Sequence, residues 1–431
     1  MKSVWLAAVG TSAIIAASTA YAQSTTGTEP TAGNADATMK KLEDFKSTGA
    51  RDLVSIPQNG EKAEAIKKNL EAIKLPPGFK ISLYALVPDA RMIAVGPQGV
   101  VTYVSTRKTK IWTVTDHGHT GRAEDVREFA PTIQFSNPNA ICFSKDGFLF
   151  SVEQNRVLVF PAAEFFYENP DVAVGVVVKK GELIPTSEES FNHSGRVCRI
   201  GPDNKLYIAV GQPYNVYAPE KYDMYYKAGL GSIIRMDRDG SNREVYAHGV
   251  RNSVGMDFSP KDKTLWFTDN QVDGMGDDIP AGELNHATKP GQNFGFPWYG
   301  GGHTRTVEYK DQTPPADLVF PVVEEVAHAA DLGMSLYTGK MFPKEYQGAI
   351  FSAQHGSWNR TVPIGARVMV TKIDADGKAP EGSKPFAEGW LNEDGEYTGR
   401  PVDVEQMHDG SLLVSDDLAG ALYRITYDGR K

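Results

Sequence analysis

Five short polar segments carry the residues that could do chemistry in this chain of 431 residues. The first, FNHSGR over residues 191–196, contains His193, and imidazole titrates near neutral pH, so His193 is a candidate general base. The second, GVRNSVG over residues 249–255, contains Arg251 and Asn252, which suit a carbonyl, carboxylate or oxyanion group. The alternatives are a solvated loop histidine and an arginine with a purely structural role.

The third segment, TDNQVDGMGDDIP over residues 268–280, is a loop rich in Asp, Asn and Gly. Hard oxygen donors on a flexible backbone suit Ca²⁺, although the spacing is not that of an EF-hand and a solvated acidic loop is the alternative. The last two segments hold His355 and Arg360 in QHGSWNR and Arg400 in GRPVDV.

These segments adjoin a recurring pattern of an apolar strand, a tight turn with Asp, Asn or Gly, and a second apolar strand. Such turns between apolar runs are typical of β-hairpins. Six copies occur, at 95–105, 143–153, 200–210, 258–269, 344–354 and 407–417. The repeat predicts an all-β fold, a six-bladed β-propeller, with a large sandwich of unrelated hairpins as the alternative. The polar segments would then converge on the axis, and residues 420–426 would close the ring against residues 79–86.

The amino-terminal part precedes this repeat. A basic start, an apolar run from Val4 to Ala17 and a small-x-small site ending at Ala22 predict a signal peptide cleaved after Ala22. A membrane anchor is the alternative, but the run is short for one. We expect a periplasmic or secreted protein with no integral membrane segment after processing. The expected divisions are a signal peptide (1–22), a disordered or extended leader (23–60), a helix and linker (61–78), and a catalytic propeller with this short helical extension before it (79–431).

Composition excludes several function classes. The chain has 45 Lys and Arg against 54 Asp and Glu, a net charge of −9, so nucleic acid and anionic membrane surfaces are poor partners. It has no dinucleotide-binding loop, Walker loop, zinc-protease motif or Ser-hydrolase elbow. It also lacks the Cys-x-x-Cys-His motif of covalent haem. Two buried free thiols are the favoured state of Cys142 and Cys198, with a disulfide as the alternative in an oxidising compartment.

The sequence resembles the pyrroloquinoline quinone (PQQ) dependent sugar dehydrogenases, and most closely their L-sorbosone dehydrogenase branch, which is itself similar to the soluble glucose and aldose sugar dehydrogenases. The matching stretches are GVRNSVGMDFSP, LWFTDNQVDGMGDDIPAGELN, GQNFGFPWYGGGH, YTGKMFPKEYQGAIFSAQHGSWNR and GRPVDV. The resemblance implies a six-bladed propeller with PQQ across its axis and a Ca²⁺ ion beside it. One departure is Pro213 to Tyr217, which stands where the sorbosone branch often has Pro-Cys-Asn-x-Cys.

The resemblance also implies residue roles. His193 resembles the base that takes the substrate hydroxyl proton, while Arg251 and Asn252 resemble the pair that contacts the quinone oxygens. The loop of Gln271, Val272 and Asp273 corresponds to the segment that offers backbone oxygens to Ca²⁺. The expected cofactor-binding residues besides Asn252 are Arg107, His355, Arg360 and Arg400.

We therefore predict a periplasmic quinoprotein that oxidises an aldose, a sorbosone-like aldehyde or a related sugar by hydride transfer to the quinone. Its electrons would pass to a separate acceptor, a quinone or a soluble carrier. One alternative is a calcium-dependent sugar lactonase-type hydrolase, which needs no basic quinone pocket. The other is a non-catalytic propeller that binds a partner through an apolar face.

Overall fold

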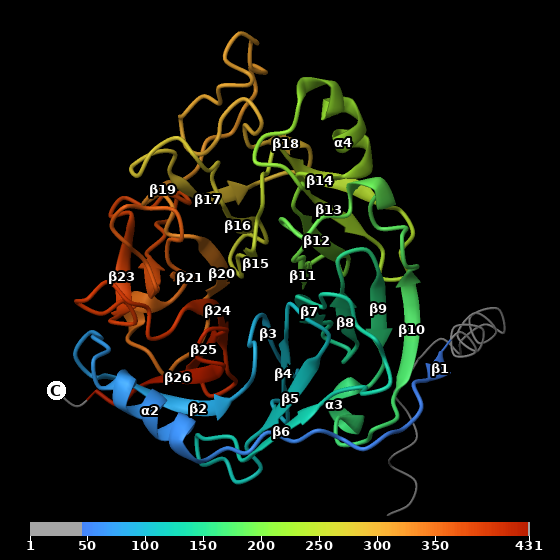
Figure 1. The fold of residues 1–431 in the computed structure, drawn as a ribbon, viewed down its shortest axis with the longest axis vertical. Helices are drawn as coiled ribbons and strands as arrows, with labels where there is room; N and C mark the ends of the chain where they lie inside the picture. Colours follow the sequence, from blue (N-terminus) through green and yellow to red (C-terminus); the bar gives the residue numbers. More distant parts are fainter. Residues whose placement is uncertain (1–44, 430–431) are drawn as a thin grey trace, which may run out of the picture. The chain divides into compact units, whose positions relative to one another are not determined.

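The computed structural model describes residues 45–429. The predicted signal peptide and most of the predicted leader lie outside the described residues. The unit that begins at Lys46 consists of six β-sheets arranged around a central axis (Figure 1). The predicted all-β, six-bladed propeller is thereby confirmed.

Each blade has four antiparallel strands that follow one another from the axis outward. Blade 1 contains β3 (Ile93–Val95), β4 (Thr102–Ser105), β5 (Ile111–Thr115) and β6 (Asp125–Glu128). Blade 2 contains β7 (Ala140–Phe143), β8 (Leu149–Val152), β9 (Val157–Phe160) and β10 (Ala173–Val178). Blade 3 contains β11 (Val197–Ile200), β12 (Leu206–Val210), β13 (Ser232–Met236) and β14 (Glu244–His248).

Blade 4 contains β15 (Gly255–Phe258), β16 (Leu265–Asp269), β17 (Gly282–Ala287) and β19 (Val323–Glu325). Blade 5 contains β20 (Asp331–Leu336), β21 (Ile350–Gln354), β22 (Arg367–Thr371) and β23 (Ser383–Glu388). Blade 6 contains β24 (Pro401–Gln406), β25 (Leu412–Asp416), β26 (Ala421–Tyr427) and β2 (Phe79–Leu86). Short β1 (Lys46–Ser47) and β18 (Gln292–Asn293) extend blades 2 and 3. Among residues 45–429 the α-helices are α2 (Glu61–Leu70), α3 (Ala163–Phe166) and α4 (Tyr222–Ala228), and short 3-10 helices lie at Thr186–Glu188, Pro219–Lys221 and Lys344–Tyr346.

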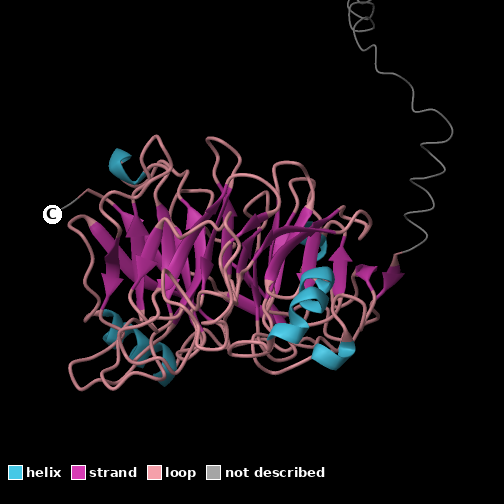
Figure 2. Ribbon diagram, turned by 90° about the horizontal axis from the view of Figure 1, so that it is seen from above, coloured by secondary structure: helices cyan, strands magenta, loops and turns pink. Residues whose placement is uncertain are grey.

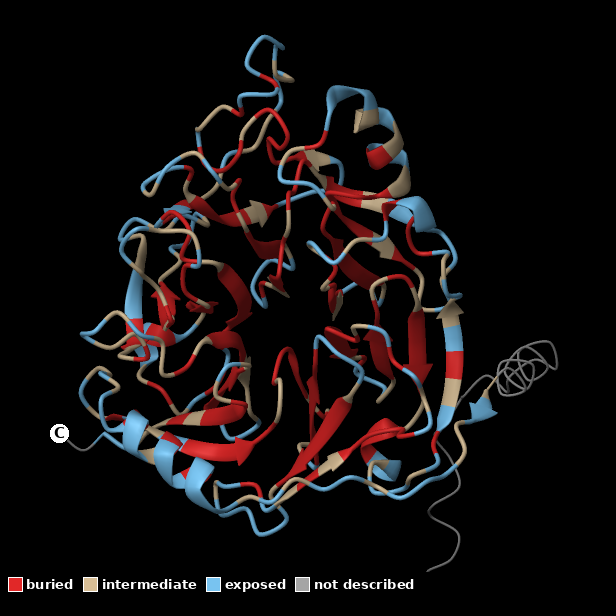
Figure 3. Cartoon of the chain, viewed as in Figure 1, coloured by how far each residue is buried: buried red, intermediate tan, exposed pale blue. Residues whose placement is uncertain are grey.

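The central strands of each blade are largely apolar and buried because both faces of the sheet are covered by neighbouring blades. Every residue of β16, with sequence LWFTD, is buried, whereas the outer strand β10 has exposed and half-buried positions. Figure 3 shows this gradient from buried inner strands to exposed outer segments. The predicted hairpin turns lie on one face of the ring, and the polar segments lie on the other. Figure 2 shows the strands running between these two loop-bearing faces.

Blade 6 closes the ring with strands from the two ends of the propeller sequence. Strand β2 pairs with β26 from Phe79 opposite Tyr427 to Leu86 opposite Ala421. This is the closure predicted for residues 79–86 and 420–426. Phe79 also packs edge-on against Phe342 and Phe386 of blade 5, at ring-centroid distances of 4.8 and 5.0 Å.

The described end of the leader is extended and runs along the outer strands of the ring. Its β1 pairs with β10 of blade 2, and Ser55 forms a bridge with Arg127 of blade 1. The Gln58 side chain then bonds to the backbone N–H and carbonyl of Leu86 in blade 6. Helix α2 buries Ile66 and Leu70, and Lys74 forms a bridge with Glu388 of blade 5. We refer to residues 46–58 as the strap.

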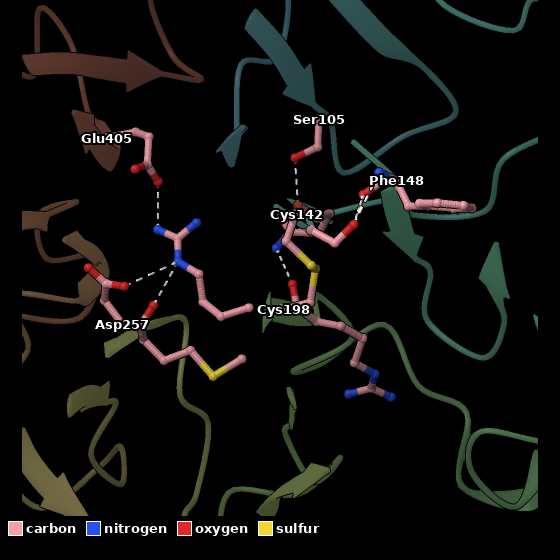
Figure 4. The surroundings of a disulfide bond; sticks show 11 residues. Ser105, Cys142, Phe148, Cys198, Asp257 and Glu405 are labelled. Carbon is pink, nitrogen blue, oxygen red and sulfur yellow. Dashed lines mark hydrogen bonds and ion pairs between the residues drawn. A yellow bond between two sulfur atoms is a disulfide. The ribbon is translucent and has the colours of Figure 1, made fainter. Parts of the chain in front are cut away.

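The favoured prediction of free thiols was wrong, because Cys142 and Cys198 form a disulfide with a Cα–Cα distance of 5.8 Å. The two cysteines lie on β7 and β11, the innermost strands of neighbouring blades, which face each other at the axis (Figure 4). Arg199 of β11 is bonded to Glu405 of blade 6 at 2.6 Å, and Glu405 is labelled in the same view. A disulfide and a salt bridge thus join the inner strands near the axis.

We predict that Phe79→Ala lowers the free energy of unfolding by about 3–5 kcal/mol, since it removes a buried ring at the junction of blades 5 and 6. Phe165→Ala is the matched control, because that ring is 66% exposed on α3, and it should change stability by no more than about 0.5 kcal/mol. Denaturant unfolding followed by circular dichroism measures both. Equal stability of the two variants would contradict the assigned role of Phe79.

Candidate active site

A cavity of about 870 Å³ lies where the polar segments converge. Its walls come from segments that precede the first strand or follow the second strand of blades 1, 3, 4 and 5. Seven residues singled out in the sequence line it: Arg107, His193, Arg251, Asn252, Gln271, Asp273 and His355. One cavity therefore joins the candidate base, the candidate arginine and part of the candidate metal loop.

Three of the singled-out residues do not line this cavity. Val272 is buried, and its backbone N–H donates to the carbonyl of Gly300. Arg360 donates to the carbonyls of Asp277 and Ala327. Arg400 donates to the carbonyls of His355, at 2.9 Å, and Gly356, at 2.5 Å. Both arginines hold the loops around the cavity through backbone oxygens.

The ring of His193 has a defined tautomer. Its Nδ1 lies 2.6 Å from the carbonyl oxygen of Gln212, which can only accept, so Nδ1 carries the proton and Nε2 is a free acceptor. Burial lowers the pKa of His193 to about 3, and the positive charge of Arg251 adds to this effect. A Cβ at Gly211 would lie 2.9 Å from the Cβ of His193, so a glycine is required there. His193 is therefore neutral at physiological pH, with Nε2 able to accept a proton.

The backbone before β15 is held by one carboxylate. Asp269 accepts hydrogen bonds from the backbone N–H groups of Arg251, at 2.7 Å, and Asn252, at 2.6 Å. Burial raises the pKa of Asp269, although these donors oppose the shift. Asp269 is the last residue of the buried strand β16, so it fixes where the adjacent pair lies in the cavity wall.

The Arg251 side chain is held by Asn215, within the segment from Pro213 to Tyr217. Its Nε and Nη2 donate to the backbone oxygen and the side-chain oxygen of Asn215, at 2.9 and 2.8 Å. Nη2 also donates to Asp273, and Nη1 donates to the carbonyl of Asn270. Four of the five guanidinium N–H groups thus have partners among the described residues. The remaining Nη1 hydrogen is left for a ligand.

Sequence reasoning missed several lining residues, of which Asn215, Arg91 and His328 have the clearest contacts. Arg91 and His355 both bond to Asp417, at 2.8 Å each. Burial lowers the pKa of His355 to about 4, so this ring is also neutral at physiological pH. Asn215 follows the second strand of blade 3, the position that the segments of Gln271 and His355 occupy in blades 4 and 5. That position was the available signal.

Amide oxygens without a hydrogen-bond partner among the described residues gather in the cavity wall. They are Oδ1 of Asn252, Oε1 of Gln271 and Oδ1 of Asn359, all buried. Within residues 45–429 no three His, Cys, Asp or Glu side chains are grouped as metal ligands. Neutral amide and backbone oxygens are ligands that Ca²⁺ accepts, so the wall fits a hard cation without a carboxylate cage.

Arg107 supplies a positive charge to the cavity. Its guanidinium lies 5.5 Å from the centroid of the Phe191 ring and forms no salt bridge within the described part of the chain. By contrast, Arg91 is paired with Asp417 and Arg251 with Asp273. Arg107 is therefore able to bind a carboxylate of a ligand.

Comparison with known proteins finds a family whose model matches this sequence. The family model described as Glucose / Sorbosone dehydrogenase matches residues 182–424. An uncharacterised protein of Borreliella burgdorferi is 36% identical over 248 residues, which cover 57% of this chain and 63% of the relative. A second, from Synechocystis, is 28% identical over 202 residues, which cover 41% of this chain and 45% of the relative. The chain thus spans less than two thirds of the length of either curated relative.

Solved structures share the fold. The calcium structure of a carbohydrate-active enzyme of family AA12 from Trichoderma reesei is 18% identical, with a TM-score of 0.67 over 83% of this chain and 97% of that chain. The holo PQQ domain of pyranose dehydrogenase from Coprinopsis cinerea is also 18% identical, with a TM-score of 0.63 over 82% and 97%. The apo soluble aldose sugar dehydrogenase of Escherichia coli is 16% identical, with a TM-score of 0.54 over 81% and 100%.

The lowered pKa of His193 predicts a specific loss of stability in acid. The unfolded ring binds a proton below about pH 6.5 and the folded ring only below about pH 3, so its contribution to stability falls as the pH drops from 6.5 towards 3. His193→Gln should therefore lose less unfolding free energy than the wild type between pH 7 and pH 4, as measured by urea unfolding. The exposed His119→Gln is the control and should follow the wild type. Parallel curves for wild type and His193→Gln would contradict the burial of a neutral ring.

Proposed function

This chain belongs to the glucose/sorbosone dehydrogenase family, and from that membership we propose that it is a PQQ- and Ca²⁺-dependent dehydrogenase of an aldose, a sorbosone-like aldehyde or a related sugar. The observation that supports this most is the pairing of two features in one cavity wall. His193 offers an unprotonated Nε2, and Arg251 is held by Asn215 with one N–H left for an anionic oxygen.

The lining residues suit PQQ, a flat anionic molecule with three carboxylates. Arg107 forms no salt bridge within residues 45–429, and Arg251 keeps one N–H group for a ligand, so both can bind negatively charged oxygens of this cofactor. When bound, PQQ supplies the site that accepts the hydride of the substrate. Arg360 and Arg400 would act indirectly in this proposal, by holding the loops that form the cavity.

The partnerless amide oxygens suit Ca²⁺. Asn252, Gln271 and Asn359 offer neutral oxygens, and the loop of Gln271, Val272 and Asp273 adds backbone carbonyls. Asp273 itself is bound to Arg251 and Asn359, so its carboxylate fixes the loop. A bound cation would polarise a neighbouring oxygen, and the chain would hold it mainly through amide and backbone groups.

His193 is the proposed base. Its Nε2 would accept the proton of the hydroxyl group that becomes the carbonyl, while the bond from Nδ1–H to Gln212 keeps the ring oriented and stabilises the charged form. The Arg251 N–H would stabilise the negative charge that accumulates on a cofactor oxygen. The remaining lining residues position the sugar and exclude water.

Location and electron acceptor complete the proposal. We propose export to the periplasm or the outside of the cell, based on the predicted signal peptide. Within residues 45–429 no helix is long and apolar enough to cross a membrane. The sequence has no covalent-haem motif, so we propose that a separate carrier takes the electrons.

We expect dye-linked sugar oxidation by the purified apo-protein only when PQQ and Ca²⁺ are both added. The panel should include aldoses, polyols and sorbosone, with each addition alone as the control, and binding of PQQ followed by absorbance titration. Turnover without PQQ, or no binding of PQQ at all, would contradict the proposal. Lactone hydrolysis without an added cofactor would support the hydrolase alternative.

His193→Gln is expected to reduce dye-linked turnover by about 100- to 10,000-fold, the usual size of a general-base contribution, and to leave PQQ binding unchanged. His117→Gln, an exposed histidine on the opposite face, is the matched control. Turnover of His193→Gln within a few-fold of the wild type would show that another group is the base.

A further inference from the structure

Four exposed apolar side chains gather beside the cavity, on loops of blades 4 and 5. They are Ile279, Val326, Trp358 and Val362, with exposed fractions of 48, 48, 76 and 66%. We refer to them as the rim patch. Soluble proteins seldom leave large apolar side chains together in water without a binding role.

Hydrogen bonds hold the loops of this patch together. Arg360 donates to the carbonyls of Asp277, Ala327 and Val362, which belong to the three loops that carry the patch. The base of the Trp358 loop is closed by a bond from the Ser357 N–H to the carbonyl of Ile364 at 2.9 Å. The rim patch is therefore preformed.

Acidic side chains flank the rim patch on two sides. Asp277 and Asp278 lie on the loop of Ile279, and the Thr361 N–H donates to Asp277 at 3.0 Å. On the other side, Tyr397 donates to the carbonyl of Ile364 at 2.8 Å, which places its loop next to that of Trp358. This loop carries three exposed acids, Glu393, Asp394 and Glu396. Arg360, which pairs with Asp278, has a largely buried side chain.

The rim patch is continuous with the proposed cofactor cavity. Trp358 belongs to the patch and also lines the cavity. Asp277, which flanks the patch, lines the cavity as well. A protein that covered this patch would lie at the mouth of the cavity. Ile279, Val326 and Val362 do not line the cavity, so they have no evident part in holding a sugar.

We propose that the rim patch is the docking site of a soluble one-electron carrier protein with a basic face, an inference that rests on the proposed function. Each sugar oxidised releases two electrons and two protons. Two carrier molecules are reduced per turnover, and the protons pass to water. The apolar centre gives contact area, and the flanking acids attract a positively charged partner and orient it.

The test uses the full-length protein loaded with PQQ and Ca²⁺ and two acceptors, a basic mitochondrial cytochrome c and the small dye dichlorophenolindophenol. The first variant combines Val326→Ser with Val362→Ser, and the second combines Glu393→Lys with Asp394→Lys. Matched controls on the opposite face are Phe165→Ser with Phe166→Ser, and Asp376→Lys. Calorimetry with oxidised cytochrome c measures binding independently of turnover.

We expect both rim variants to lower kcat/KM for cytochrome c about 10-fold at low salt and to weaken its binding, with dye-linked turnover and the controls unchanged. The effect of the charge variant should disappear at about 0.5 M salt, where exposed charges are screened. An acidic cytochrome of similar size should react slowly with the wild type.

Three outcomes would overturn the docking site. In the first, the rim variants bind and reduce cytochrome c as the wild type does. In the second, the wild type does not bind cytochrome c. In the third, the rim variants lose dye-linked turnover in parallel with cytochrome c reduction, which would assign the patch to sugar entry. Absence of dye-linked turnover in the wild type would instead count against the proposed function. The binding measurement would still decide the docking site in that case.

Discussion

The pairing of β2 with β26 is the constraint on which the rest of this structure depends, because it turns a row of sheets into a closed ring. The cavity has no wall of its own: its lining comes from loops of four blades, and each loop is placed by the strand it adjoins. His193, Arg251 and His355 meet only because blades 3, 4 and 5 are fixed at set angles. The Cys142–Cys198 disulfide and the Arg199–Glu405 bond join inner strands of the same ring.

Much of this was predictable because the repeat carries two kinds of information. Turns with Asp, Asn or Gly between apolar runs mark each inner hairpin, and the position of a polar segment relative to that hairpin tells which face it occupies. His193, Arg251 and Gln271 were singled out in this way, and all three line the cavity. The repeat count also predicted how the ring closes. An apolar strand is left over at each end of the repeats, at residues 79–86 and 420–426, and these two strands were expected to pair.

The errors and omissions share a physical cause. The place of a loop residue relative to the nearest strand does not determine which partner a long side chain reaches. Arg360 and Arg400 donate hydrogen bonds to backbone oxygens of neighbouring loops. The disulfide of Cys142 and Cys198 was only the alternative prediction, because their contact depends on how two blades face each other at the axis. Asn215 was missed as a support of Arg251, since its bonds reach across to the next blade. Such contacts between blades leave no local pattern.

The strap has a consequence for self-association. Outer strands of propeller blades present free backbone donors and acceptors, which invite pairing with another chain. The strap, its helix and the following linker cover part of this edge in blades 2, 1, 6 and 5, and β18 extends blade 3. Among the described residues β19 of blade 4 remains uncovered by a further strand, and it is short, with the exposed charge of Glu324. Loss of the strap would therefore expose the outer strand edges of the ring to pairing with other chains, and aggregation would follow before the cavity was affected.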